Sequence, residues 1–317
     1  MINKNSKIFL VGHKGFVGSA ILRLLKKKGY KNIFYKTKKN LDLRNQKKTF
    51  SYILKIKPDA VILAAGKVGG IKANSNFPAE FIYDNLSIQN NVIQGSFKAK
   101  VKDLIFLGSS CIYPKYSDQP IKESYLLSGI LEPTNESYAI AKIAGVKLCE
   151  SYNRQYKTNY KCLMPSNIFG PGDNYNLENS HFFPAIIKKL YNAKKNNISK
   201  TIFWGSGSSK RELTFVDEIA EACIFFLKKK TRHCVINIGS GYEKSIKDYV
   251  NFVSKKINNK SKIVFDNNKK IDGTPRKLLD CSVAKKYGWK SKFKFSKAFE
   301  VTYADFLKNH RKHLLKI

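Results

Sequence analysis

An apolar stretch at residues 7–11 runs directly into a turn that carries three glycines and opens a helical pattern. The turn reads Gly12-His13-Lys14-Gly15-Phe16-Val17-Gly18. Glycines at this spacing allow a tight turn and a close approach of the backbone to a pyrophosphate, while the helix N-terminus presents free N–H groups. Because the turn stands at the first junction of a strand and a helix, the sequence predicts a dinucleotide site lined by all seven residues.

Short apolar stretches alternate with helical patterns through the first 165 residues. The expected strands cover residues 7–11, 32–36, 60–64, 104–108 and 160–164, and the expected helices cover 16–28, 44–56, 78–98 and 136–156. Such alternation is typical of an α/β protein with a Rossmann-type, doubly wound parallel sheet. After Pro165 the rhythm breaks into a loop rich in Gly, Pro and Asn, followed by an expected helix at 183–195 and strands at 201–204, 235–238 and 263–265.

The change of rhythm predicts two domains. Residues 1–165 are expected to form a dinucleotide-binding domain. Residues 166–317 are expected to form mainly a smaller α/β domain that binds the substrate, with segments near 211–240 returning to the first domain.

The chain carries 59 Lys and Arg against 23 Asp and Glu, a formal net charge of +36, which raises the question of nucleic-acid binding. Only seven of the basic residues are Arg, the residue that suits bidentate recognition of phosphates and bases. The lysines are spread along the whole chain and do not gather in one stripe. We therefore expect no nucleic-acid partner.

No apolar run approaches the roughly 18 residues that a membrane span needs. The six cysteines are scattered, and no two of them form a CxxC pair. We therefore expect no membrane anchor, no bound metal, no dense disulfide framework and a reducing, cytoplasmic location.

The segment after the second expected strand indicates which dinucleotide binds. NAD enzymes place an acid there for the ribose hydroxyls, whereas NADP enzymes need positive charge for the 2′-phosphate. The segment reads Tyr35-Lys36-Thr37-Lys38-Lys39, with no acid before Asp42. The missing acid, together with Lys14 in the glycine turn, predicts NADP, with Lys38 and Asp42 at its site.

The pair Tyr138-x-x-x-Lys142 places two side chains on one face of an expected helix. A nearby ammonium favours tyrosinate, so we expect Lys142 to lower the pKa of Tyr138, which would protonate a carbonyl oxygen that receives hydride. Upstream, Leu107-Gly108-Ser109-Ser110-Cys111 ends the fourth expected strand. Open parallel sheets bind ligands at the C-terminal ends of their strands, so Ser109 is expected to bond the same oxygen, and Leu107, Gly108 and Ser110 to line the cofactor site.

These features together resemble the extended short-chain dehydrogenase/reductases, a family that modifies nucleotide sugars. Longer strings are similar to one branch of it, the GDP-L-fucose synthases, and the likeness runs from the first expected strand to near residue 290. The strings are those at 64–71, 108–114, 132–142, 179–181 and 272–277. Two departures are Gly66, where the family commonly has Ala, and the use of Lys for Arg at Lys14, Lys38 and Lys189, which keeps charge but weakens bidentate phosphate contact.

The resemblance implies a 3,5-epimerase/4-reductase that converts GDP-4-keto-6-deoxy-D-mannose to GDP-L-fucose with NADPH. Cys111 and His181 match the family's epimerisation pair, with the thiolate as base and the imidazole as acid. For the reduction, the resemblance implies that Lys142 holds the nicotinamide ribose beside Tyr138.

The resemblance also implies binding residues and an assembly. His181 and the run Pro165-Ser166-Asn167-Ile168 are expected to lie against the cofactor. The residues expected to bind the GDP-sugar are Lys189, Trp204, Arg211 and Asp272. A homodimer built by the helices at 78–98 and 136–156 is expected.

Two other interpretations stay open. The first is another NAD(P)-dependent nucleotide-sugar epimerase or reductase of the same fold; a dehydratase would need an Asp-Glu pair where this chain has Cys111-Ile112. The second is an NADP-sensing or nucleic-acid-binding protein built on an inactive dehydrogenase scaffold. The complete set of Ser109, Tyr138 and Lys142 argues against the second, because such a scaffold need not keep it.

Overall fold

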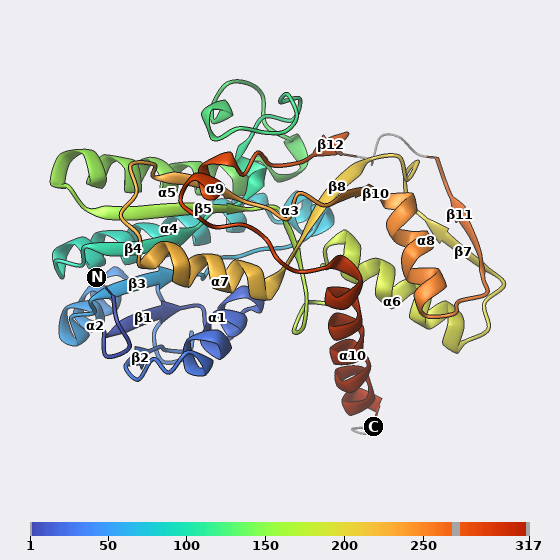
Figure 1. Cartoon of the computed structure of the whole chain (residues 1–317), viewed down its shortest axis with the longest axis horizontal. Helices are drawn as coiled ribbons and strands as arrows, with labels where there is room; N and C mark the ends of the chain where they lie inside the picture. The colour runs from blue at the N-terminus through green and yellow to red at the C-terminus, as the bar shows by residue number, and fades with distance from the viewer. Residues whose placement is uncertain (1, 268–272, 315–317) are drawn as a thin grey trace.

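A parallel sheet of six strands lies between two layers of helices in the computed structural model, which describes residues 2–267 and 273–314 (Figure 1). In spatial order the strands are β2 (Ile33–Phe34), β1 (Ile8–Val11), β3 (Ala60–Leu63), β4 (Asp103–Leu107), β5 (Asn159–Pro165) and β9 (Val235–Ile238). Every neighbouring pair in this sheet is parallel. The expected α/β class with a doubly wound parallel sheet is confirmed.

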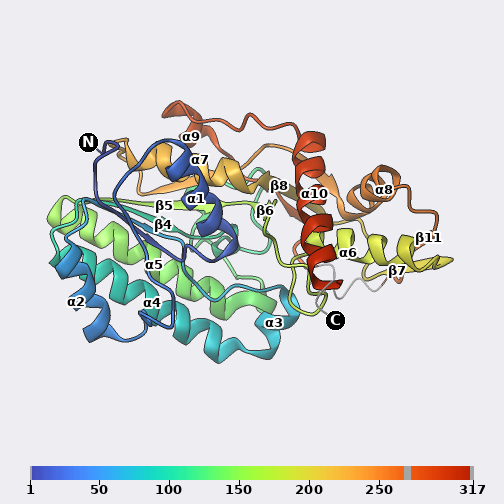
Figure 2. The same cartoon turned by 90° about the horizontal axis from the view of Figure 1, so that it is seen from below.

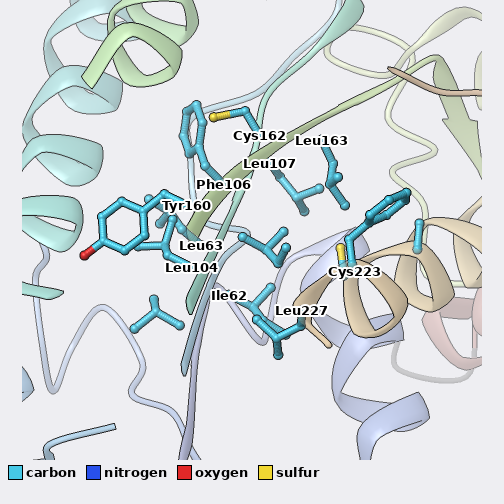
Figure 3. Close-up of a cluster of buried hydrophobic side chains, with 14 of the residues drawn as sticks. Ile62, Leu63, Leu104, Phe106, Leu107, Tyr160, Cys162, Leu163, Cys223 and Leu227 are labelled. Atoms are coloured by element: carbon cyan, nitrogen blue, oxygen red, sulfur yellow. The ribbon is translucent and has the colours of Figure 1, made fainter. Parts of the chain in front are cut away.

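The inner strands are apolar because helices cover both faces of the sheet. All four residues of β1 and all four of β3 are buried, as expected for strands that no water reaches. Figure 3 shows Ile62 and Leu63 of β3 among side chains from β4, β5 and α7 (Val216–Leu227). Each such side chain contributes about 1.5–3 kcal/mol through burial, which makes this layer the main source of stability.

One helical layer contains α1 (Phe16–Lys27) and α7, and the other contains α2 (Gln46–Ile56), α4 (Pro78–Lys98) and α5 (Glu136–Tyr156) (Figure 2). The helices expected in the first half of the chain are found within a few residues of their expected limits. Helix α7 was not expected from the sequence. It follows β8 (Lys210–Phe215) with no intervening loop, so residues 213–227 carry no Gly, Pro or Asn that would separate the strand from the helix.

The strand order creates a crevice beside the glycine turn. From β1 the chain passes to β2 on one side and then to β3 on the other side of β1. The connections therefore diverge at the C-terminal ends of β1 and β3, the place where open α/β sheets bind ligands. The ends of β4 and β5 lie along the same edge, so four successive loops meet there.

A second region lies at one end of the sheet (Figure 1). Its strands and helices are β6 (Asn167–Phe169), α6 (Phe182–Lys195), β7 (Lys200–Phe203), β8, β10 (Glu243–Ser245), α8 (Ile246–Lys256), β11 (Lys262–Phe265), β12 (Arg276–Lys277) and α10 (Phe295–Leu314). Its core is largely aromatic; the rings of Phe169 and Phe183 meet edge to face at 5.0 Å. The strand expected at 235–238 joins the central sheet as β9, and it lies in the segment near 211–240 that was expected to return to the first domain. The domain division at residue 165 stays a prediction.

Within the residues that the structure describes, no helix is long and apolar enough to cross a lipid bilayer.

Lys161 is a charged side chain inside this fold. It lies on β5 with no exposed surface, and its Nζ is 3.9 Å from a carboxylate oxygen of Asp103. Burial lowers the pKa of Lys161 to about 8. The folded state therefore holds this proton less tightly than the unfolded chain does, which costs stability at any pH below the folded-state pKa.

Replacing Lys161 with Met is expected to raise the free energy of unfolding by about 2–3 kcal/mol near neutral pH, because the buried charge is removed. The gain is expected to shrink as the pH rises above 8 towards the pKa of the unfolded chain, since the wild-type lysine then loses its proton in the folded state. Urea unfolding at neutral and alkaline pH measures the difference, with the exposed Lys39→Met as control. A gain that is unchanged or larger at alkaline pH would contradict this account.

Candidate active site

The glycine turn after β1 is shaped for close approach. Gly12 has a φ of +91°, and its carbonyl accepts a hydrogen bond from Gly15 N at 2.9 Å. A Cβ on Gly18 would lie 2.0 Å from Gly12 O, so a side chain there would break the turn. Helix α1 begins at Phe16 with no side-chain cap, which leaves its first N–H groups facing the turn.

His13 and Lys14 occupy the outside of this turn. The His13 ring is buried and lies 4.5 Å from the ring of Tyr35, whereas Lys14 is exposed. Burial, and then the charge of Lys14, lower the pKa of His13. The histidine is therefore neutral at physiological pH, and Lys14 carries the positive charge of the turn.

The segment after β2 is basic, and its first acidic residue, Asp42, is already paired with an arginine. Lys38 is exposed. Asp42 accepts hydrogen bonds from the Arg44 guanidinium, with Nη2 2.7 Å from Oδ2, and these bonds lower the pKa of Asp42 to about 2. Arg44 also reaches Asp84 on α4 at 3.0 Å. The Asp42 carboxylate is therefore engaged by Arg44, which also pairs with Asp84.

Tyr138 and Lys142 lie on the buried face of α5, as the sequence predicts. Lys142 Nζ donates to the Leu107 carbonyl at 2.9 Å and lies 5.8 Å from the centre of the Tyr138 ring. Burial lowers the pKa of Lys142 to about 8. The hydrogen bond to the end of β4 thus holds the Lys142 ammonium close to the Tyr138 phenol.

The expected lowering of the Tyr138 pKa is wrong for this structure. Burial and the nearby Cys111 raise the pKa of Tyr138, and a hydrogen bond with Ser109 opposes this only in part. Desolvation disfavours the phenolate more strongly than neighbours stabilise it. Tyr138 therefore keeps its proton at neutral pH, which is the form a proton donor needs.

The loop after β4 carries Ser109, Ser110 and Cys111. The Ser109 hydroxyl accepts a hydrogen bond from Cys111 N at 3.2 Å and begins a short 3-10 turn (Ser110–Ile112) in which Ser110 is buried. Gly108 lies against Met164 so closely that a Cβ would come within 2.3 Å of the methionine side chain. The strand end thus holds Ser109 and Cys111 beside Tyr138.

Cys111 is half-buried between two N–H donors. Asn135 Nδ2 donates to its Sγ at 3.4 Å, and Lys277 Nζ lies 3.8 Å from the same sulfur. Lys277 belongs to β12, which pairs in parallel with β8 so that Lys277 stands opposite Arg211. Neither Asn135 nor Lys277 was expected from the sequence, although both lie in strings that carry the family resemblance.

His181 comes from the second region and is held against the first. Gly70 N donates to Asn179 O at 3.1 Å, and a Cβ on Gly70 would lie 2.5 Å from Ser180 O. An ion pair of Lys72 with Glu178 joins the same two segments. Solvent reaches His181 at the start of α6, yet the protein atoms around it lower its pKa by desolvation.

The residues after β5 face the second region. Pro165 ends β5, and Ser166 shares a hydrogen bond of 2.7 Å with Thr214. Asn167, which begins β6 ahead of Ile168, donates to Glu212 O at 3.1 Å. These contacts hold residues 166–167 against β8 of the second region. The segment starts at the C-terminal end of β5, which lies at the same edge of the central sheet as the end of β4.

The expected substrate residues lie further out. Lys189 Nζ donates to Ile202 O at 2.8 Å and lies 5.4 Å from the ring of Trp204, whose side chain is 67% exposed. Arg211 is half-buried on β8. Asp272 lies outside the described residues.

Glu212, next to Arg211, was also missed by the sequence analysis. Its carboxylate is fully buried and accepts from Gly241 N at 2.6 Å and Leu279 N at 3.0 Å. Burial raises the pKa of Glu212 to about 7. The side chain therefore ties β8 to the segment that follows Lys277, and no sequence signal distinguishes such a residue from a surface glutamate.

Comparison with known proteins gives one consistent result. Residues 8–239 match the model of the NAD dependent epimerase/dehydratase family. The chain is 47% identical over 98% of its length to GDP-L-fucose synthase 1 of Arabidopsis thaliana, 95% of which it covers. It is 43% identical to the GDP-L-fucose synthase of Escherichia coli K12, covering 96% of this chain and 97% of the relative.

A solved structure extends the likeness to three dimensions. A GDP-mannoheptose C4 reductase from Campylobacter jejuni with NADP bound matches with a TM-score of 0.89 at 35% identity. The match covers 96% of this chain and 99% of that one, so it includes both regions of the fold.

Gly70→Ala is expected to lower the free energy of unfolding by about 1–3 kcal/mol, because the new Cβ would collide with the Ser180 carbonyl. It should also displace His181, seen as a shift of its ring-proton NMR signals. Gly129→Ala, which meets only the Pro114 side chain at 3.3 Å, is the matched control. An unchanged His181 signal in Gly70→Ala would show that this contact does not place the histidine.

Proposed function

Because the chain belongs to the NAD dependent epimerase/dehydratase family, we propose that it is an NADPH-dependent GDP-L-fucose synthase. It would epimerise GDP-4-keto-6-deoxy-D-mannose at C3 and C5 and then reduce the C4 ketone. The relatives at 43–47% identity support this assignment. The observation that carries it is the position of the Cys111 thiol between two N–H donors, beside Tyr138 and Ser109.

The glycine turn fits a dinucleotide pyrophosphate. Side chains at Gly12 and Gly18 would collide with the neighbouring backbone, so the two glycines allow the tight turn, and the first N–H groups of α1 are uncapped. Lys14 and Lys38 supply positive charge for a 2′-phosphate, while Asp42 is held by Arg44. NADPH, when bound, supplies the hydride that C4 of the sugar accepts.

The remaining cofactor contacts follow from the strand ends. We assign Leu107 at the end of β4, with Gly108 and Ser110 in the loop after it, to the nicotinamide half, together with Lys142. Residues 165–168, which begin at the last residue of β5, and His181 at the start of α6 would line the same side of the cofactor. This assignment is supported by the common edge of the sheet on which β4 and β5 end.

For the epimerisation, the Cys111 thiolate would remove the acidic proton on C3 or C5 next to the ketone. The His181 imidazolium would return a proton to the opposite face of the same carbon. Desolvation by the surrounding protein atoms lowers the pKa of His181, so its protonated fraction falls as the pH rises towards neutrality. The epimerisation rate is therefore expected to decline as the pH rises, because the imidazolium that returns the proton is lost.

For the reduction, Tyr138 would give its proton to the C4 oxygen as hydride arrives. Its raised pKa keeps the phenol protonated until that moment, and the developing alkoxide takes the proton. Ser109 would bond the same oxygen, and the Lys142 ammonium would stabilise the phenolate that remains. The two reactions share one pocket because each needs the same ketone.

The nucleotide end of the substrate would be held by the second region. Arg211 and Lys189 suit the diphosphate, and the exposed ring of Trp204 suits stacking. Asp272 remains assigned to the substrate on the resemblance alone. Lys277, opposite Arg211 on the neighbouring strand, brings this end of the substrate site to Cys111.

A second candidate is a C4 reductase that does not epimerise, because the relative from Campylobacter jejuni is named for C4 reduction. The presence of Cys111 and His181 does not by itself distinguish the two candidates. The proposal of both reactions is therefore tested by the fate of the C3 and C5 protons.

Replacing Cys111 with Ser is expected to slow epimerisation by at least about 100-fold, because a hydroxyl is a far weaker base than a thiolate. Tyr138→Phe is expected to leave epimerisation intact and to slow NADPH oxidation by about 100-fold or more. Nicotinamide absorbance and NMR of the sugar separate the two steps. Full GDP-L-fucose formation by Cys111→Ser would remove Cys111 from the mechanism, and no NADPH oxidation by wild type would defeat the proposed function.

We also propose a homodimer formed by α4 and α5, which lie side by side on one face (Figure 2). Each carries an exposed apolar side chain, Tyr83 on α4 and Ile140 on α5. Ile140→Glu is expected to shift the sedimentation coefficient from dimer to monomer. Val301→Glu, on α10 with the same 42% exposure, is the matched control and should sediment as wild type. A monomeric wild-type protein would contradict this assembly.

A further inference from the structure

Asn135 stands at the N-cap position of α5 but does not cap the helix. No side-chain hydrogen bond from this residue reaches the first turn of α5. Asn45 occupies the equivalent position of α2 and behaves in the usual way, because its Oδ1 accepts from Lys48 N at 2.9 Å. Of these two asparagines at the N-cap position, Asn45 caps its helix with its side chain and Asn135 does not.

The Asn135 amide is turned towards the thiol of Cys111. Nδ2 donates to Sγ at 3.4 Å. Oδ1 is buried and accepts no hydrogen bond from the part of the chain that the structure describes. A lost cap and an unsatisfied buried acceptor both destabilise a protein, so this orientation is explained by the contact with sulfur and not by stability.

Within the described residues, the side-chain hydrogen bonds that reach the Cys111 sulfur come from donors. Lys277 Nζ approaches Sγ from the second region, and Cys111 also packs against the hydrophobic cluster of Ala73, Phe81 and Tyr138. Tyr138 keeps its proton, so it places no competing charge next to the thiol. A thiolate only accepts hydrogen bonds, and here an amide N–H and an ammonium point at it.

We propose that Asn135 is a positioning residue that holds the Cys111 sulfur as a thiolate for removal of the sugar protons. The inference deepens the proposed function and rests on it for the identity of the substrate. Asn135 precedes Tyr138 by three residues and Lys142 by seven, so one end of α5 sets the proton donor, its cation and the orientation of the base.

The test is the rate at which iodoacetamide alkylates Cys111, followed on its peptide by mass spectrometry across the neutral pH range. Only the thiolate reacts. Asn135→Ala is expected to slow the reaction about tenfold near neutral pH and to move its pH profile to higher pH, since one charge-assisted hydrogen bond is lost. Asn135→Asp, which keeps the shape but offers no amide N–H, is expected to slow it further.

Asn45→Ala is the matched control, because it removes a real cap far from Cys111. It should lower the melting temperature and leave alkylation unchanged, whereas Asn135→Ala should alter alkylation without lowering the melting temperature. Wild-type alkylation in both Asn135 variants, or faster alkylation in Asn135→Ala, would overturn the proposal. Faster reaction would mean that the amide oxygen accepts from a neutral thiol.

The measurement uses the free protein and no sugar, so it is independent of the proposed function. Slowed alkylation together with no turnover of GDP-4-keto-6-deoxy-D-mannose would support the role of Asn135 and refute the substrate. With turnover, the same variants should lower the rate of solvent exchange at C3 and C5 more than the rate of hydride transfer.

Discussion

The buried ammonium of Lys142 is the interaction on which the site depends. Its Nζ donates to the carbonyl of Leu107, the last residue of β4, and lies 4.7 Å from the centre of the Phe106 ring. This contact fixes the start of α5 against the end of a central strand. Tyr138 is carried by that helix and Ser109 by the loop after that strand, so this hydrogen bond links the two elements that position them. A fully buried ammonium is costly, and its lowered pKa is the sign of that cost.

The second region is joined to this centre by backbone contacts that leave little freedom. Gly70 meets the carbonyl of Ser180, and the segment after Lys277 pairs with residues 119–121, where Ile121 N donates to Leu278 O at 2.7 Å. Both contacts lie beside proposed catalytic groups, His181 in one case and Cys111 in the other. Contacts between the two regions therefore help to position His181 and Cys111, the proposed epimerisation pair. Tyr138 and Ser109, proposed for the reduction, are positioned within the first region. This difference gives a physical reason for one pocket to support two reactions.

Local patterns made the sheet, the glycine turn and the Tyr138–Lys142 pair predictable from sequence. Each is a short string whose geometry is set by neighbours along the chain. The contact of Lys277 with Cys111 joins residues far apart in sequence, and the missing cap of Asn135 is visible only in the orientation of its amide. The direction of the Tyr138 pKa was predicted wrongly because burial, which no motif states, outweighs a nearby charge. Helix α7 was missed because β8 runs into it without a turn.

The central claim is that one pocket exchanges the protons at C3 and C5 with solvent and then delivers hydride to C4. The most direct measurement is the reaction in D₂O with unlabelled NADPH, read by NMR of the GDP-sugar product. The account predicts deuterium at C3 and C5 and protium at C4. A reduced product with protium at both C3 and C5 would contradict it, because the protein would then be a reductase without epimerase activity.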